Sequence, residues 1–92
     1  GQDMRAVISV VGKDTVGILS NVSSLCARNM VNVVDVTQTI LQDMFVMVMM
    51  VDISSLSCSF SDFSDQVTGY GKEAGLVIHV MHENIFNSMH KI

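Results

Sequence analysis

Nine residues decide the fold of this chain, and they read Phe45-Val46-Met47-Val48-Met49-Met50-Val51-Asp52-Ile53. Successive side chains of a β-strand point to opposite sides of its sheet, and here both sides are apolar. One side carries Phe45, Met47, Met49, Val51 and Ile53, and the other carries Val46, Val48 and Met50. A strand that is apolar on both sides belongs in the middle of a sheet, so we expect residues 45–53 to be central.

Three further strands and two helices are predicted around this segment. Apolar and other residues alternate over Met4–Val11, over Val33–Leu41 and over the short stretch Leu76–Val80, which is typical of strands. Apolar residues recur every three or four positions over Ile18–Cys26 and over Phe60–Ala74, which is the spacing of one helix face. Asp14 or Thr15 is a candidate cap for the first helix.

The order of elements is strand, helix, strand, strand, helix, strand, followed by a helical tail that carries Ile85, Phe86 and Met89. This order predicts an α+β, ferredoxin-like βαββαβ sandwich, in which an antiparallel sheet carries both helices on one face. Strands 4–11 and 45–53 are then the central pair, and the other two strands form the edges. Asn29 and Gly75 are suited to end the two helices.

The face of the sheet away from the helices is also apolar. In a single copy it would expose Val7, Val11, Val46, Val48 and Met50. Covering apolar surface is worth about 25 cal/mol per Å², and another subunit is the available cover. We therefore expect a homodimer or a higher homo-oligomer.

Composition limits the classes of function. The 92 residues fit one domain, expected over residues 4–92, with Gly1-Gln2-Asp3 before Met4 resembling a cloning remnant. The five basic residues are scattered and the net charge is −4, which argues against nucleic-acid binding. The longest apolar run, Met44–Val51, is far shorter than the roughly 20 residues of a membrane helix. We expect a cytoplasmic protein that binds no membrane.

The two cysteines, Cys26 and Cys58, are too few for a metal ribbon or a disulfide framework. Buried free thiols are the ordinary interpretation. Cys26 falls on the apolar face of the first predicted helix, where it is poorly placed as a nucleophile. No Ser-His-Asp, Cys-His or paired-carboxylate arrangement is indicated by the spacing, so we expect no enzyme and no cofactor.

The sequence His79-Val80-Met81-His82-Glu83, with His90 in the tail, offers side chains that zinc accepts. Residues three apart in a strand point to opposite faces, so His79 and His82 could converge only if the strand ended between them. We expect no metal site, and a metal-dependent enzyme centred on His79, His82 and Glu83 stays a weaker alternative.

The loop after the first strand is the best candidate site. A helix N-terminus has unpaired N–H groups and a partial positive charge, which suit a carboxylate. Gly12 and Gly17 allow close approach of the backbone, and Asp14 could hold an ammonium group. The alternative interpretation is that Asp14 only caps the helix and Gly17 only permits packing.

Two stretches of the chain resemble a known family. The stretches Val10-Val11-Gly12-Lys13-Asp14-Thr15-Val16-Gly17-Ile18 and Asn32-Val33-Val34-Asp35-Val36-Thr37-Gln38-Thr39-Ile40 are similar to the ACT domain, an amino-acid-sensing module of metabolic enzymes and regulators. The ending, residues 81–92, resembles an uncharacterised family of stand-alone bacterial and archaeal proteins with a single ACT domain. It is also similar to the repeats of the glycine cleavage regulator.

The resemblance implies a non-enzymatic regulator that pairs with another copy and binds a small amino acid between the loop of one copy and the second strand of its neighbour. The implied ligand-binding residues are Gly12, Asp14, Val16, Gly17 and Ile18 from the loop, and Asn32 and Val33 from the strand. Backbone groups of the loop would take the carboxylate, and Asp14 or Asn32 would meet the ammonium. Such a module would act in trans on an unknown regulated protein; the alternative is a ligand-free oligomerisation module.

Overall fold

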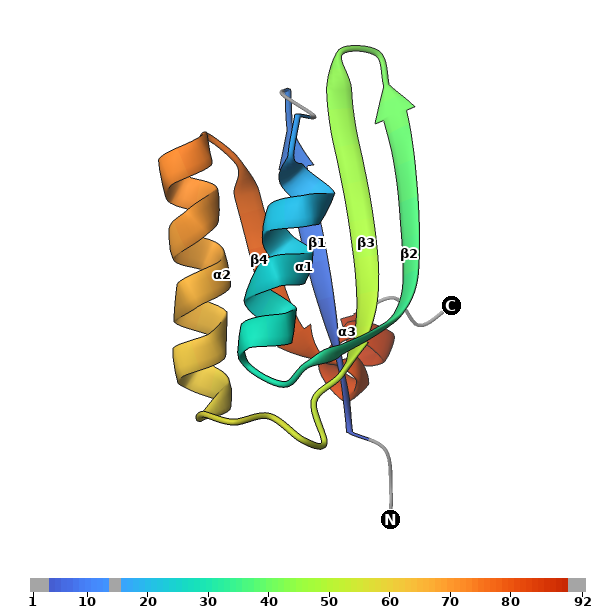
Figure 1. The fold of residues 1–92 in the computed structure, drawn as a ribbon. Helices are drawn as coiled ribbons and strands as arrows, with labels where there is room; N and C mark the ends of the chain where they lie inside the picture. Colours follow the sequence, from blue (N-terminus) through green and yellow to red (C-terminus); the bar gives the residue numbers. More distant parts are fainter. Residues whose placement is uncertain (1–3, 14–15, 90–92) are drawn as a thin grey trace.

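The computed structural model describes residues 4–13 and 16–89 of the chain and forms one sheet covered by helices (Figure 1). The elements are β1 (Arg5–Gly12), α1 (Ile18–Arg28), β2 (Asn32–Leu41), β3 (Met44–Asp52), α2 (Phe60–Ala74), β4 (Val77–His82) and α3 (Glu83–Met89). Every strand pairing is antiparallel, and the order across the sheet is β2-β3-β1-β4. The predicted ferredoxin-like fold is confirmed, with β1 and β3 in the centre.

The core lies between the sheet and the helices α1 and α2, which cover the same face (Figure 1). The helix-facing side chains of the central strand, Phe45, Met47, Met49 and Val51, are all buried, as their alternation predicted. On α2 the buried stripe consists of Phe63, Val67 and Gly71.

The helix predicted over Phe60–Ala74 is confirmed, but its apolar stripe leaves the core at its end, where Ala74 is exposed and Tyr70 is half-buried. The physical reason is Gly71, whose missing side chain leaves room for Ile78 of β4. A Cβ at Gly71 would lie 2.7 Å from Cγ1 of Ile78. Glycine therefore lets α2 approach the sheet at the position where an apolar side chain is expected.

The outer face of the sheet differs from the prediction at Val7, which was expected to face solvent and is only 1% exposed. The other four residues of that expected set, Val11, Val46, Val48 and Met50, are half-buried. Helix α3 contacts β1 and β4 and lies behind the sheet in Figure 1, opposite α1 and α2. An ion pair of 3.7 Å between Arg5 and Glu83 joins β1 to the start of α3. Helix α3 thus covers part of the sheet face that we expected another subunit to cover.

The helix ends follow local chemistry. The hydroxyl of Ser59 accepts a 3.0 Å hydrogen bond from the Asp62 N–H, which caps α2, and Gly75 ends α2 with φ +73°. Helix α1 ends at Asn29 as predicted. The left-handed residue, however, is the following Met30, with φ 61°. Asn29 acts instead through its buried side chain, whose Nδ2 donates to the Leu25 carbonyl at 2.7 Å.

Candidate functional site at the end of β1

Gly12 and Gly17 bracket the loop between β1 and α1, and each has a structural reason to be glycine. Gly12 is the buried last residue of β1, where a Cβ would overlap the side chain of Leu76. Gly17 is the N-cap of α1 and has φ +74°, a conformation that side chains disfavour. Asp14 and Thr15, the predicted capping residues, lie outside the described residues.

Because Gly17 has no side chain, it makes no capping hydrogen bond to the start of α1. The carbonyl of Gly17 accepts the first helical bond, from the Asn21 N–H at 2.9 Å. The N–H groups of the first turn therefore point out of the helix end without a cap from this residue. A helix N-terminus carries a partial positive charge, which suits a negatively charged group such as a carboxylate.

Of the two apolar loop residues, one belongs to the core and the other to the surface. Ile18 is 2% exposed and packs among the core residues, so its side chain is not available to a ligand. Val16 is 84% exposed beside Gly17. Val16 is therefore a surface residue and Ile18 a core residue.

Asn32 and Val33 lie at the opposite end of the sheet from this loop. Asn32 pairs with Asp52, and Asp52 pairs with Arg5 at the start of β1. Gly12, at the loop end of β1, is seven residues from Arg5, which is about 23 Å at ~3.3 Å per residue. Within one copy, the predicted site residues thus form two separate groups.

The two β2 residues also point to different faces. Val33 pairs with the core residue Val51 on the helix side, whereas Asn32 pairs with Asp52 on the other side. The register of β2 shifts between Val33 and Asp35, which marks a β-bulge. Asp52 accepts hydrogen bonds from the Ser54 hydroxyl at 2.6 Å and the Ser54 N–H at 2.8 Å, and these bonds lower its pKa. An ionised carboxylate therefore lies beside Asn32.

The sequence interpretation missed Ile40, which lies at the loop end of the sheet. Ile40 pairs with Phe45, which pairs with Gly12, so the three residues form one row across the strands. Its side chain lies on the helix-facing side and is 67% exposed. The tight turn at residues 42–43 was the available signal, because it places Ile40 opposite Phe45.

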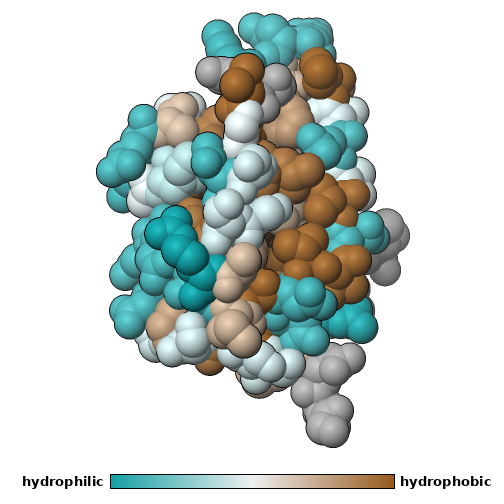
Figure 2. Space-filling model, in the orientation of Figure 1, coloured by the Kyte–Doolittle hydropathy of each residue, from teal (hydrophilic) through white to brown (hydrophobic). Residues whose placement is uncertain are grey.

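Apolar surface gathers on this side of the molecule. Figure 2 shows it where β3 and β2 extend beyond α1. The helix-facing apolar side chains of β2 are Val33, Val36 and Ile40, and all three are at least partly accessible. Because β2 is an edge strand, its outer backbone groups have no partner strand in the sheet of one copy.

The histidine cluster does not assemble. His79 pairs with Ser9 on the outer face, whereas His82 lies on the helix side and stacks on Phe60 with ring centroids 4.2 Å apart. In residues 4–13 and 16–89, no group of three His, Cys, Asp or Glu side chains is arranged to hold a metal. His90 lies outside the described residues.

The two cysteines are free, with Cys26 buried and Cys58 partly buried. Burial raises the pKa of the Cys26 thiol to about 11, which keeps it protonated and unreactive near neutral pH. None of the helices in the described part of the chain combines the length and the apolar character needed to cross a lipid bilayer.

Comparison with known proteins decides the family. The family model for the ACT domain matches residues 4–81 of this chain. The chain belongs to the ACT-domain family. Two UPF0237 proteins that span nearly the same length are also similar to this ACT domain. The relative from Listeria innocua is 47% identical over 97% of this chain and all of its own, and that from Methanococcus maripaludis is 48% identical over 96% and 98%.

Solved structures agree with this assignment. An ACT domain protein from Streptococcus pneumoniae superimposes with a TM-score of 0.79 at 32% identity, covering 92% of this chain and 96% of that one. A putative glycine cleavage system transcriptional repressor has a TM-score of 0.67 at 21% identity, over 89% of this chain and 47% of that one. The second likeness concerns the fold alone. The family relationship therefore makes this chain a regulatory type of domain.

Proposed function

We propose that this ACT domain is a non-enzymatic regulatory module that binds a small amino acid between two copies of the chain and acts in trans on a separate protein. The loop of one copy would supply the carboxylate site, and the start of β2 of the other copy would supply the second wall. The observation that carries the proposal is the 84% exposure of Val16 beside Gly17, the N-cap of α1, which makes no side-chain capping hydrogen bond.

The carboxylate of the ligand would lie at the N-terminus of α1. There the unpaired N–H groups donate to it and the helix dipole favours its charge, by about 0.3–1 kcal/mol for the dipole alone. Gly17 has no side chain that would compete with the ligand for these groups. The apolar side chains of Val16 and Ile40 would border a small ligand at this end.

The two copies would meet through β2. An antiparallel pairing of two β2 edges by a two-fold axis places the Asn32 end of one strand beside the Leu41 end of the other. That arrangement brings the distant group, Asn32 and Val33, to the loop of the neighbouring copy. The ammonium of the ligand would then meet Asn32 of the neighbouring copy, and Asp14 is the second candidate for this role.

A screen with the twenty amino acids tests the proposal. Binding to the folded state raises the thermal unfolding midpoint, since a ligand at 100 times its Kd adds about 2.7 kcal/mol. We expect at least one small amino acid to raise the midpoint at millimolar concentration. Val16→Glu places a negative charge beside the carboxylate site, and we expect it to abolish the shift.

Ser61→Glu is the matched control, because Ser61 is exposed in the first turn of α2, away from the loop. This variant should keep the full ligand response. If none of the amino acids shifts the midpoint, or if Val16→Glu responds like Ser61→Glu, the assigned site is wrong. The alternative of a ligand-free oligomerisation module predicts the first of these results, together with a stable oligomer.

A further inference from the structure

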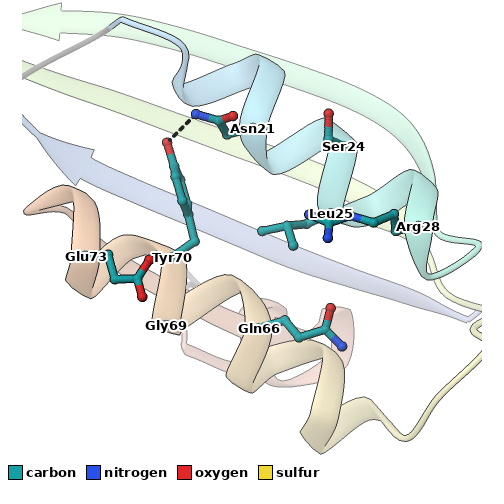
Figure 3. A pocket seen from close by; sticks show the side chains of 8 residues that line it. All are labelled: Asn21, Ser24, Leu25, Arg28, Gln66, Gly69, Tyr70 and Glu73. Carbon is teal, nitrogen blue, oxygen red and sulfur yellow. Dashed lines mark hydrogen bonds between the residues drawn. The ribbon is translucent and has the colours of Figure 1, made fainter.

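A cleft of about 480 Å³ separates α1 from α2 (Figure 3), and its Asn21 end lies one helical turn from Gly17. Its sides come from two helices that run in opposite directions, so that Asn21 faces Tyr70 and Arg28 lies toward the Gln66 end. Pockets that hold one small molecule have volumes of about 300–1,000 Å³. The cleft is large enough for such a molecule.

Gly69 opens the α2 side of this cleft, and packing does not explain why it is glycine. Glycine inside a helix costs stability relative to alanine. A Cβ at Gly69 would meet nothing within 4 Å, whereas a Cβ at Gly71 would clash with Ile78. The space in front of Gly69 is therefore free for a bound group.

Opposite charges mark the two ends of the cleft. Arg28 lies near Gln66, and Glu73 lies one turn beyond Tyr70. Neither charge forms an ion pair with another side chain in the described part of the chain. Arg28 lies seven residues beyond Asn21 on α1, about 10 Å at 1.5 Å per residue.

Neutral hydrogen-bonding groups line the cleft between these charges. Asn21 Nδ2 donates a 3.2 Å hydrogen bond to the Tyr70 hydroxyl at the Glu73 end. At the Arg28 end, Gln66 is held by Asn29, whose Nδ2 donates to its Oε1 at 2.9 Å. The side chain of Leu25 supplies an apolar surface between the two ends.

We propose that the cleft between α1 and α2 binds an elongated zwitterion, with its carboxylate on Arg28 and Gln66 and its ammonium on Glu73. The methylene chain of such a molecule lies over Leu25 and Gly69. An ω-amino acid, a diamino acid or a dipeptide has this separation of charges, whereas the main-chain groups of an α-amino acid are too close together. The cleft is a second site, and it does not depend on the proposed site at the loop.

The test is a titration of the ¹⁵N-labelled protein with 6-aminohexanoate, followed by amide chemical shifts. We expect saturable shifts on α1 and α2 around Leu25 and Gly69. Hexanoate and hexylamine each retain one charge, so we expect each to bind at least tenfold more weakly. Equal shifts with all three compounds, or shifts elsewhere on the protein only, would overturn the proposal.

Variants separate this site from effects on folding. Gly69→Ala fills the free space, and we expect it to weaken binding at least tenfold, while Ser61→Ala on the exposed side of α2 leaves binding unchanged. Arg28→Gln and Glu73→Gln should each weaken binding similarly. Their charge-matched controls are Lys72→Gln and Asp65→Asn, which alter exposed residues outside the cleft.

Two results would contradict the proposed site. One is unchanged binding in Gly69→Ala with an intact spectrum, and the other is an equal loss in the controls and the cleft variants. Val16→Glu should bind 6-aminohexanoate as the unaltered chain does, so failure of the loop site leaves this test intact.

Discussion

Nδ2 of Asn29, the residue that ends α1, donates a 2.9 Å hydrogen bond to Oε1 of Gln66 on α2. The same amide group also bonds the Leu25 carbonyl at 2.7 Å, and Asn29 Oδ1 accepts from the Cys58 thiol at 3.4 Å. One buried side chain therefore closes the end of α1 and links it to α2 and to the loop before α2.

Replacing Asn29 tests the strength of this link. Asn29→Ala removes the hydrogen bonds and leaves the Leu25 carbonyl and Gln66 without this partner, so we expect a loss of about 1–3 kcal/mol in the free energy of unfolding. Urea unfolding followed by circular dichroism measures it. Asn84→Ala, at an exposed position of α3, is the control and should change stability by less than about 0.5 kcal/mol. Equal losses in the two variants would refute the assigned role.

The two glycines of α2 should respond in opposite directions to alanine. Gly71→Ala forces a Cβ against Ile78, and we expect it to lower the free energy of unfolding by about 1–2 kcal/mol. Gly69→Ala meets no neighbour and removes the backbone entropy cost, so we expect a gain of about 0.5–1 kcal/mol. Thermal and urea unfolding of both variants measure these changes. A destabilised Gly69→Ala protein would show that packing, rather than a ligand, requires this glycine.

Burial of Val7 behind the sheet is also testable. Val7→Ala shortens a side chain that is 1% exposed, and we expect the free energy of unfolding to fall by about 2 kcal/mol. Val77→Ala on the same face is the matched control, because Val77 is 58% exposed and pairs with Val11. Its expected change is below about 0.5 kcal/mol. Similar values for the two variants, from denaturant unfolding, would contradict the cover by α3.

Alkaline pH should destabilise the fold through Cys26. Its pKa is raised from 9.0 to about 11 in the folded chain, so between these values the unfolded thiol loses its proton while the folded thiol keeps it. The contribution of the protonated Cys26 thiol to the free energy of unfolding is complete below pH 9. It falls as the pH rises toward 11, by a total on the order of 2 kcal/mol. Urea unfolding of the unaltered chain and of Cys26→Ala, measured from pH 8 to 11, isolates this contribution as the difference between their free energies of unfolding. A difference that does not change with pH would contradict the assigned burial of the thiol.

The strands and helices were predictable because each is fixed by local alternation or helical spacing. The two apolar faces of β3 sufficed to make it central, and Gly75 was a correct stop for α2. Val7 was misplaced because its cover comes from α3, an element at the other end of the chain, and side-chain periodicity carries no information on where a tail folds back. Gly71 was missed as a contact because a pattern of apolar side chains does not register a residue without one.

The candidate site was less predictable than the fold. The loop between Gly12 and Gly17 could be located from its residues, since a helix start after a strand has known chemistry. The separation of Asn32 from that loop depends on strand register and sheet order, which local spacing does not contain. The cleft between α1 and α2 depends on how two helices pack and had no counterpart in the sequence interpretation.

Mixing two inactive variants tests the shared site most directly. Val16→Glu damages the loop wall and Asn32→Lys, which places a cation near the ammonium, damages the β2 wall. In a dimer of one copy of each, one of the two sites combines undamaged walls from both chains. Random mixing makes about half of the dimers mixed, so about one quarter of all sites are intact.

The measurement is the stoichiometry of amino-acid binding by calorimetry, for each variant alone and for the two after joint unfolding and refolding. We expect no binding to either variant alone and binding at about one quarter of the sites in the mixture. In the control mixture, Val16→Glu is refolded with Asn84→Lys, so the β2 walls of both chains are intact. This mixture should retain about half of the binding sites. A mixture of the two inactive variants that still binds nothing, while this control binds, would contradict a site built from two copies.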